Sequence, residues 1–91
     1  MFAVVVREVG DAAMIEGSWD IVRDTVAPQV HGAPGFVSAL WMTDGGGETL
    51  NVLVFETEAA ARRALDAARD ALRPPFMRVA SIDLYSVGAT A

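Results

Sequence analysis

PGFVSALWMTDGGGETLNVLVFET, residues 34–57, contains two apolar runs separated by a glycine-rich break. The aromatic and aliphatic composition of both runs favours strands. The break, DGGGE at 44–48, suits a hairpin turn because glycine adopts positive φ without steric cost. We therefore expect a β-hairpin whose strands are Phe36–Thr43 and Leu50–Glu56. The loop is longer than a two-residue turn, which indicates a bulge or a flexible tip.

A phosphate-binding loop is the alternative interpretation of the three glycines. Such loops join a strand to the N-terminus of a helix. Here a second strand follows, and the sequence contains no Gly-Lys-Ser or Gly-Lys-Thr. The pattern therefore favours the hairpin.

The composition excludes several classes of function. The 91 residues are enough for one domain spanning 1–91, and the 53% of apolar residues is too high for a disordered chain. A net charge of −5 argues against nucleic-acid binding, which needs clustered cations. The sequence lacks cysteine and lysine, which excludes thiolate metal sites, cysteine nucleophiles and Schiff-base chemistry.

The N-terminal sequence, MFAVVVREVG, is apolar but lacks the positively charged start and the cleavage site of a signal peptide. No apolar run reaches the roughly 18–20 residues that span a bilayer. We expect a cytoplasmic protein that does not bind membranes.

One strand and one helix are predicted before the hairpin. Residues Phe2–Glu8 are β-branched and apolar, which predicts a strand. A helix is predicted near Ser18–Gln29, capped by Ser18, or by Asp11 if the helix is longer. Pro28 is expected to kink or end it. Five apolar residues recur at helical spacing: Ile15, Trp19, Val22, Val26 and Val30.

One helix and one strand are predicted after the hairpin. Thr57 is a good N-cap for a helix over Glu58–Arg73, and two prolines stop that helix. Arg69 and Arg73 are expected to complement its negative end. The last strand is predicted at Met77–Val87. The apolar face of the helix is expected to contain Ala61, Ala64, Leu65, Ala68 and Leu72.

The resulting order, βαββαβ, predicts a ferredoxin-like α+β fold, in which two helices cover one face of a four-stranded antiparallel sheet. The first three strands are apolar on both faces, although the helices can cover only one of them. A second copy is the natural cover for the other face. We therefore expect a homodimer.

Three features carry a resemblance to a known family. These are Pro28 near the end of the first helix, PGF at 34–36, and VFETE at 54–58 before an alanine-rich helix. With the βαββαβ order, they make nearly the whole chain resemble the antibiotic biosynthesis monooxygenase-like family of dimeric α/β-barrel proteins. That family includes cofactor-independent monooxygenases of polycyclic phenols, quinol-type oxygenases and haem-degrading enzymes. The resemblance implies a dimer with a pocket between sheet and helices in each subunit.

The monooxygenase members use an asparagine, a tryptophan and sometimes a tyrosine or arginine around that pocket. The resemblance therefore draws attention to Asn51, Trp19, Trp41, Tyr85 and Arg78. Haem-degrading members carry an asparagine on the first strand and a histidine on the second helix. This chain has neither, which argues against haem.

Each candidate also has a structural explanation. His31, the only histidine, is either a general base or a solvated residue at a helix end. Trp19 and Trp41 either stack on an aromatic ligand or pack in the core or interface. Asn51 either contacts a ligand or occupies a solvent-facing edge. One histidine and scattered carboxylates do not predict a metal site.

Tyr85 and Arg78 are the remaining candidates for substrate binding. Tyr85 lies two residues from Asp83 on one strand face, where the two could orient a substrate hydroxyl. Arg78 is predicted on the opposite face, where it could bind an anion or pair with Glu56. We expect neither residue to act with a metal or an organic cofactor.

Three functions remain open from the sequence. The chain is an oxygenase of a small aromatic phenol or quinol, a binding module without turnover, or a structural dimer. A deprotonated electron-rich ring can react with dioxygen without a cofactor, so a site need only orient it, exclude water and supply a base such as His31. No fingerprint of flavin or haem binding is present.

Overall fold

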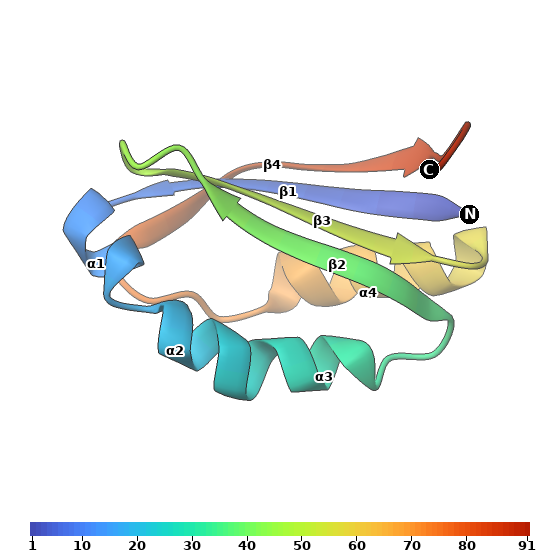
Figure 1. Cartoon of the computed structure of the whole chain (residues 1–91), viewed down its shortest axis with the longest axis horizontal. Helices are drawn as coiled ribbons and strands as arrows, with labels where there is room; N and C mark the ends of the chain where they lie inside the picture. Colours follow the sequence, from blue (N-terminus) through green and yellow to red (C-terminus); the bar gives the residue numbers. More distant parts are fainter.

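A computed structural model describes the whole chain, Met1–Ala91, and contains one four-stranded antiparallel sheet. The strand order is β2-β3-β1-β4, and all three neighbouring pairs are antiparallel. The helices lie together on one face of this sheet (Figure 1). The predicted ferredoxin-like fold is confirmed. The strands are β1 (Phe2–Gly10), β2 (Phe36–Thr43), β3 (Glu48–Phe55) and β4 (Met77–Ser86).

The helical segments between β1 and β2 form a broken helix, which lies below β2 and which we call the first helical layer. The helix after the hairpin, α4, packs against β1, β3 and β4. Asp11 caps α1 by accepting a hydrogen bond of 2.9 Å from Met14 N. Ser18 precedes α2, but its hydroxyl donates back to Ile15 O and caps no amide. The chain is helical from both predicted starts, but only Asp11 acts as a side-chain cap, so the predicted capping by Ser18 is wrong. The helices are α1 (Ala12–Glu16), α2 (Trp19–Ile21), the π-helical segment η1 (Val22–Val26), α3 (Ala27–His31) and α4 (Glu58–Asp70).

Pro28 does not end the first helical layer, which continues to His31. Proline cannot donate a hydrogen bond, and in a regular α-helix its ring would crowd the carbonyl group of Asp24, four residues earlier. The helix widens at this point, and Ala27 N donates to Val22 O, five residues back. The π-helical turn lets the helix pass the proline instead of stopping at it.

The helix α4 is three residues shorter than predicted, because Ala71 is already extended. Leu72, expected on the apolar face, is fully exposed. Arg73, expected at the helix end, has left the helix and turned towards the sheet. Pro74 disfavours helical conformation in the residue before it, which helps to release Arg73.

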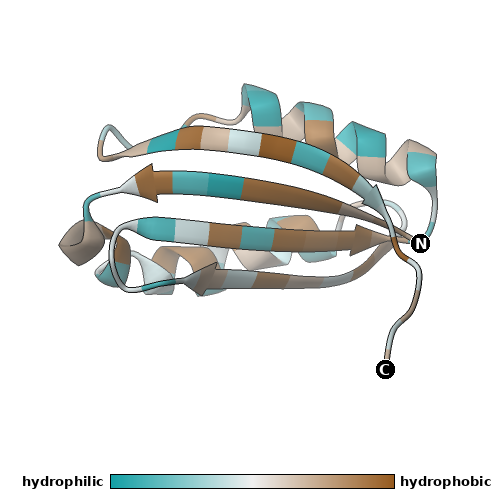
Figure 2. Ribbon diagram, turned by 90° about the horizontal axis from the view of Figure 1, so that it is seen from above, coloured by the Kyte–Doolittle hydropathy of each residue, from teal (hydrophilic) through white to brown (hydrophobic).

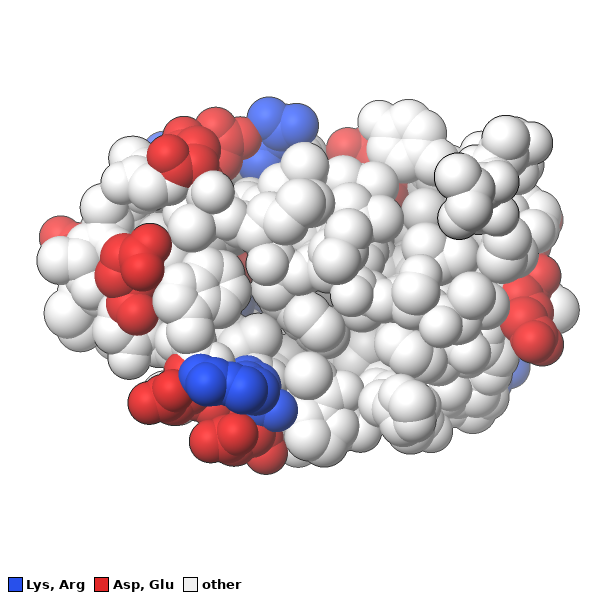
Figure 3. Space-filling model, viewed as in Figure 1, with Lys and Arg blue, Asp and Glu red and all other residues white.

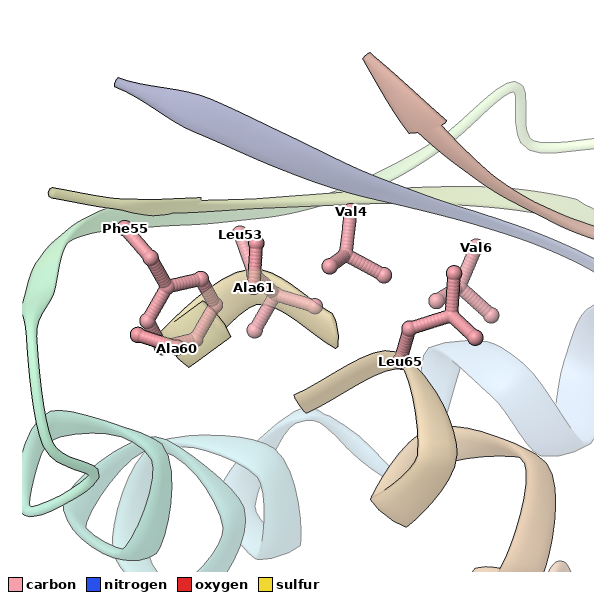
Figure 4. Close-up of a cluster of buried hydrophobic side chains, with 7 residues drawn as sticks. All are labelled: Val4, Val6, Leu53, Phe55, Ala60, Ala61 and Leu65. Carbon is pink, nitrogen blue, oxygen red and sulfur yellow. The ribbon is translucent and has the colours of Figure 1, made fainter. Parts of the chain in front are cut away.

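The core lies between α4 and the centre of the sheet, as Figure 4 shows. Its small residues Ala60 and Ala61 let the α4 backbone approach β1 and β3 closely. No fully buried residue comes from α2, η1 or α3. These three segments therefore pack more loosely than α4, whereas Ile15 of α1 is fully buried. The seven core residues are Val4, Val6, Leu53, Phe55, Ala60, Ala61 and Leu65.

The opposite face of the sheet carries no helix (Figure 2), and the apolar residues Leu50, Val52 and Val54 of β3 lie on it. Leu40 and Tyr85 are 61% and 56% exposed there, although both are large. An ion pair of 2.7 Å between Arg7 and Glu48 borders this surface. None of the helices is long and apolar enough to cross a membrane.

The predicted hairpin is confirmed, with β3 beginning two residues earlier than expected. Asp44 Oδ1 accepts hydrogen bonds from Gly46 N and Glu48 N, which hold the pKa of Asp44 below its ordinary value. Gly47 has a φ of 99°, and its carbonyl accepts from Gly10 N at 2.8 Å. The tip of the hairpin is thereby tied to the end of β1.

Replacing Gly47 by alanine is expected to lower the free energy of unfolding by about 2 kcal/mol or more. A Cβ atom there would stand 2.6 Å from Gly10 O, and the positive φ adds strain. Gly46→Ala is the matched control because its Cβ atom would make only ordinary contacts, and we expect a change within about 0.5 kcal/mol. Urea denaturation followed by circular dichroism measures both. Equal midpoints for the two variants would contradict this account of the turn.

Candidate functional site

An open hollow of about 350 Å³ lies between the first helical layer and β2. We call it the tryptophan hollow, because Trp19 of α2 and Trp41 of β2 both line it. Figure 3 shows this side of the molecule as a broad uncharged surface with charged groups towards its edges. Arg23 is the only charged residue of the lining, and it pairs with Asp20 at 2.6 Å. The other lining residues are Val22, Ala27, Ala39 and Leu40.

The π-helical turn forms part of the wall of this hollow. Val22 and Ala27 are the two residues joined by the widened hydrogen bond, and both belong to the lining. Such turns occur often at functional sites, because they change the direction of side chains within a helix. The sequence signal for this wall was Pro28, which we expected to interrupt the helix.

A polar cluster surrounds a buried carboxylate on the helix side of the sheet. Glu8 is 8% exposed, and its Oε2 accepts from Arg73 Nε at 2.6 Å. Its Oε1 accepts from Asn51 Nδ2 at 2.9 Å and, more weakly, from Thr49 Oγ1 at 3.4 Å. We call these four residues the Glu8 cluster.

Asn51 of the Glu8 cluster is not part of the lining of the tryptophan hollow, but it neighbours Trp41, which is. Asn51 lies opposite Trp41 in the β2–β3 pair, so their side chains share one face of the sheet. On its other side Asn51 lies opposite Val6 of the core. The polar cluster and the aromatic wall are therefore adjacent.

Glu8, Thr49 and Arg73 were not among the predicted site residues. Glu8 continues the period-two pattern of Val4 and Val6 on the core face of β1, and that placement was the available signal. A carboxylate on a core face needs a partner, because burying an unpaired charge costs several kcal/mol. The identity of the partner was hidden, since Arg73 is 65 residues away.

The structure brings Trp19 and Trp41 together in the hollow and places Asn51 opposite Trp41 but outside the lining. The other three predicted residues lie elsewhere. His31 is exposed, and its ring lies 5.3 Å from that of Phe36, outside the lining of the hollow. Arg78 borders a separate groove of about 340 Å³ at the end of β1 and the start of β4. Tyr85 lies opposite Ala3, on the face of the sheet without helices. The roles of all six residues stay predictions. No three His, Cys, Asp or Glu residues are grouped so that they could hold a metal ion.

Comparison with known proteins establishes the fold alone. No family model and no curated protein sequence matches the chain. Solved structures do match. The Streptomyces coelicolor monooxygenase from ActVA-Orf6, bound to nanaomycin D, is 19% identical, with a TM-score of 0.64 over 99% of this chain and 89% of that one.

Two further structures share the fold. SnoaB, a cofactor-independent oxygenase from Streptomyces nogalater, is 22% identical, with a TM-score of 0.64 over 98% of this chain and 94% of its own. The haem-degrader MhuD from Mycobacterium tuberculosis, with two haems bound, is 17% identical, with a TM-score of 0.61 over 100% and 99%. The chain shares their fold. The resemblance to antibiotic biosynthesis monooxygenase-like proteins is confirmed at this level.

Arg73→Met is expected to lower the free energy of unfolding by about 3 kcal/mol, because it leaves the Glu8 carboxylate buried without its ion-pair partner. Arg69→Met is the matched control. Arg69 is exposed, and its contact with Asp66 is long, at 3.9 Å. Its loss should therefore lower the free energy of unfolding by no more than about 0.5 kcal/mol. Urea denaturation compares the two variants, and similar losses of stability for both would show that the Glu8 cluster is unimportant for folding.

Proposed function

We propose that the tryptophan hollow binds a small, planar and largely apolar molecule with one or two oxygen groups, and that the protein oxygenates this molecule without a cofactor. One observation carries the proposal. Trp19 and Trp41 come from different layers of the fold and line one apolar hollow, beside which lies the amide of Asn51.

The dimensions and chemistry of the hollow support this ligand class. Its volume of about 350 Å³ is within the range of small-molecule sites. Two indole rings offer flat apolar surfaces on which an aromatic ring can stack. Asn51 supplies a hydrogen-bonding group that can orient an oxygen atom of the ligand.

The reaction needs only dioxygen besides the phenolic substrate. The phenol loses its proton, and dioxygen forms a bond to the ring carbon opposite the phenolate oxygen. Cleavage of the O–O bond and loss of the ring hydrogen at that carbon then release water and leave a quinone. The substrate supplies all four electrons, so the protein has to orient the ring, exclude water and provide a base that takes the phenol's proton and returns it when the O–O bond breaks to give water.

The structural neighbours are compatible with this proposal and with one competitor. SnoaB is described as a cofactor-independent oxygenase, and the ActVA-Orf6 protein holds nanaomycin D, whereas MhuD binds haem. The two residues that the resemblance implies for haem degradation are missing, since β1 has no asparagine and α4 has no histidine. We therefore favour a phenol over haem as the ligand of this protein.

Binding without turnover is the second candidate, and the position of His31 favours it. The histidine proposed as a base packs against Phe36 and is not part of the hollow's lining. A binding module needs the hollow but no base, so oxygen uptake distinguishes the two functions.

We further propose that two copies pair through the sheet face that has no helices. Val52 and Val54 lie near the centre of this face, and Leu40 and Met42 extend it along β2. Large apolar surfaces of this kind are usually covered by another protein surface. A two-fold pairing would leave the side of each hollow formed by Trp19 and Trp41 accessible, since Trp41 lies on the other face of the sheet. Leu40, on the edge strand β2, borders both the hollow and the proposed interface.

Addition of a phenol or quinol is expected to quench or shift the tryptophan fluorescence, because the ligand contacts both indole rings. Trp41→Leu should weaken binding by about tenfold or more, since loss of a stacking surface of this size costs about 1.4 kcal/mol. Leu72→Ala is the control, because Leu72 is fully exposed on the loop after α4.

Oxygen uptake measured with the same compounds decides between the two functions. Uptake with water and quinone as products supports the oxygenase, whereas binding without uptake supports the binding module. An unchanged fluorescence spectrum with every phenol, quinol and quinone tested would contradict both.

Val52→Arg is expected to convert the dimer to a monomer, because it places an unpaired charge in the proposed interface at a cost of several kcal/mol. Ala67→Arg, on the exposed side of α4, is the control and should remain dimeric. Sedimentation velocity at micromolar concentration measures both. A folded monomer formed by the unmodified chain would refute the pairing.

A further inference from the structure

We propose that Glu8 is a positioning residue that fixes which end of the Asn51 amide faces the ligand, so that the tryptophan hollow selects molecules that donate a hydrogen bond. This inference rests on the proposed function, because it assigns the ligand's polar group at the same site. It adds Glu8 to the residues of the site and predicts that ligands with a hydrogen-bond donor are preferred over those with an acceptor.

The contacts of Glu8 show how it would act. A carboxylate can only accept hydrogen bonds, so the asparagine amide must turn its Nδ2 group towards Glu8 Oε1, at 2.9 Å. The other carboxylate oxygen is held at 2.6 Å by Arg73 Nε. Arg73 is itself anchored by a bond of 3.1 Å from Nη1 to Ala71 O. Glu8 is therefore held from both sides and cannot easily turn away.

The amide of Asn51 is left with one free polar atom. Its Oδ1 accepts no hydrogen bond from the protein, and the protein has no buried side-chain oxygen or nitrogen without a partner. The Oδ1 atom is consequently accessible. Because Nδ2 is turned to Glu8, the free polar atom of the amide is an acceptor, on a residue that lies opposite Trp41.

Glu8 itself is poorly suited to be the base of the reaction. Both of its oxygens already accept hydrogen bonds, and the Arg73 guanidinium is its ion-pair partner. Its function at this site is therefore to orient Asn51.

The consequence is a preference between ligands of similar shape. A hydroxyl group can donate to Asn51 Oδ1, whereas a carbonyl group in the same place cannot and would face another acceptor. One neutral hydrogen bond gained or lost in a partly buried site changes affinity by about fivefold. The unmodified protein should bind a phenol more tightly than a similar aromatic ketone.

Glu8→Gln is expected to reverse this preference between ligands, because a glutamine amide both donates and accepts hydrogen bonds. Arg73 can only donate, so the new side chain must turn its carbonyl oxygen towards Arg73 and its NH₂ group towards Asn51. Asn51 then has to present Oδ1 to that NH₂ group, and its own Nδ2 becomes the free atom. The free polar atom of Asn51 changes from a hydrogen-bond acceptor to a hydrogen-bond donor.

Isothermal calorimetry with 2-naphthol and 2-acetylnaphthalene tests the inference. We expect the unmodified protein to bind the naphthol about fivefold more tightly, and Glu8→Gln to bind the ketone more tightly. Thr49→Val is the matched control, because it removes the 3.4 Å bond to the same carboxylate oxygen without changing the amide. It should keep the preference of the unmodified protein even if stability falls. An identical preference in the unmodified protein and Glu8→Gln would overturn the inference.

The side-chain amide signal of Asn51 in NMR spectra provides a test that needs no ligand. One Nδ2 proton should be shifted downfield and protected from exchange in the unmodified protein, and this protection should be lost in Glu8→Gln. An unprotected amide in the unmodified protein overturns the inference even where ligands bind. A protected amide in a protein that binds neither compound supports the orientation by Glu8 and contradicts the proposed function alone.

Discussion

The close packing of α4 against β1 and β3 determines how the rest of the molecule is arranged. Ala60 and Ala61 are buried against the central strands, and α4 supplies every helical residue of the core cluster. The first helical layer is left to cover β2, where the large rings of Trp19 and Trp41 separate it from the strand. The tryptophan hollow is thus a result of unequal packing, in which small residues make one contact tight and large ones leave the other open.

The Glu8–Arg73 pair connects this packing to chemistry. The pair is largely withdrawn from water, so breaking it costs far more than breaking an exposed pair, although its net contribution to stability is smaller than that cost. It also joins the end of β1 to the chain just beyond α4. A contact that holds the fold together therefore sets the orientation of Asn51 beside the hollow.

Patterns within a few residues predicted the helices and strands. The features that the sequence did not predict depend on contacts between residues that are distant in sequence. The glycines at 45–47 and the Thr57 cap act within a few residues, so the hairpin and the start of α4 could be predicted. The end of α4 could not, because Arg73 pairs with a residue at the other end of the chain. The two tryptophans were identified as candidates from their chemistry, but only the fold shows that they line one hollow. His31 had suitable chemistry as well, and its position beside Phe36 follows from tertiary packing that no local pattern reveals.

We propose that the tryptophan hollow is a binding site for an aromatic molecule. A crystal structure of the unmodified protein grown with 2-naphthol tests it most directly. We expect density for the ring between Trp19 and Trp41, with the hydroxyl oxygen within hydrogen-bonding distance of Asn51 Oδ1. An empty hollow at saturating ligand, or density only on the sheet face without helices, would contradict it.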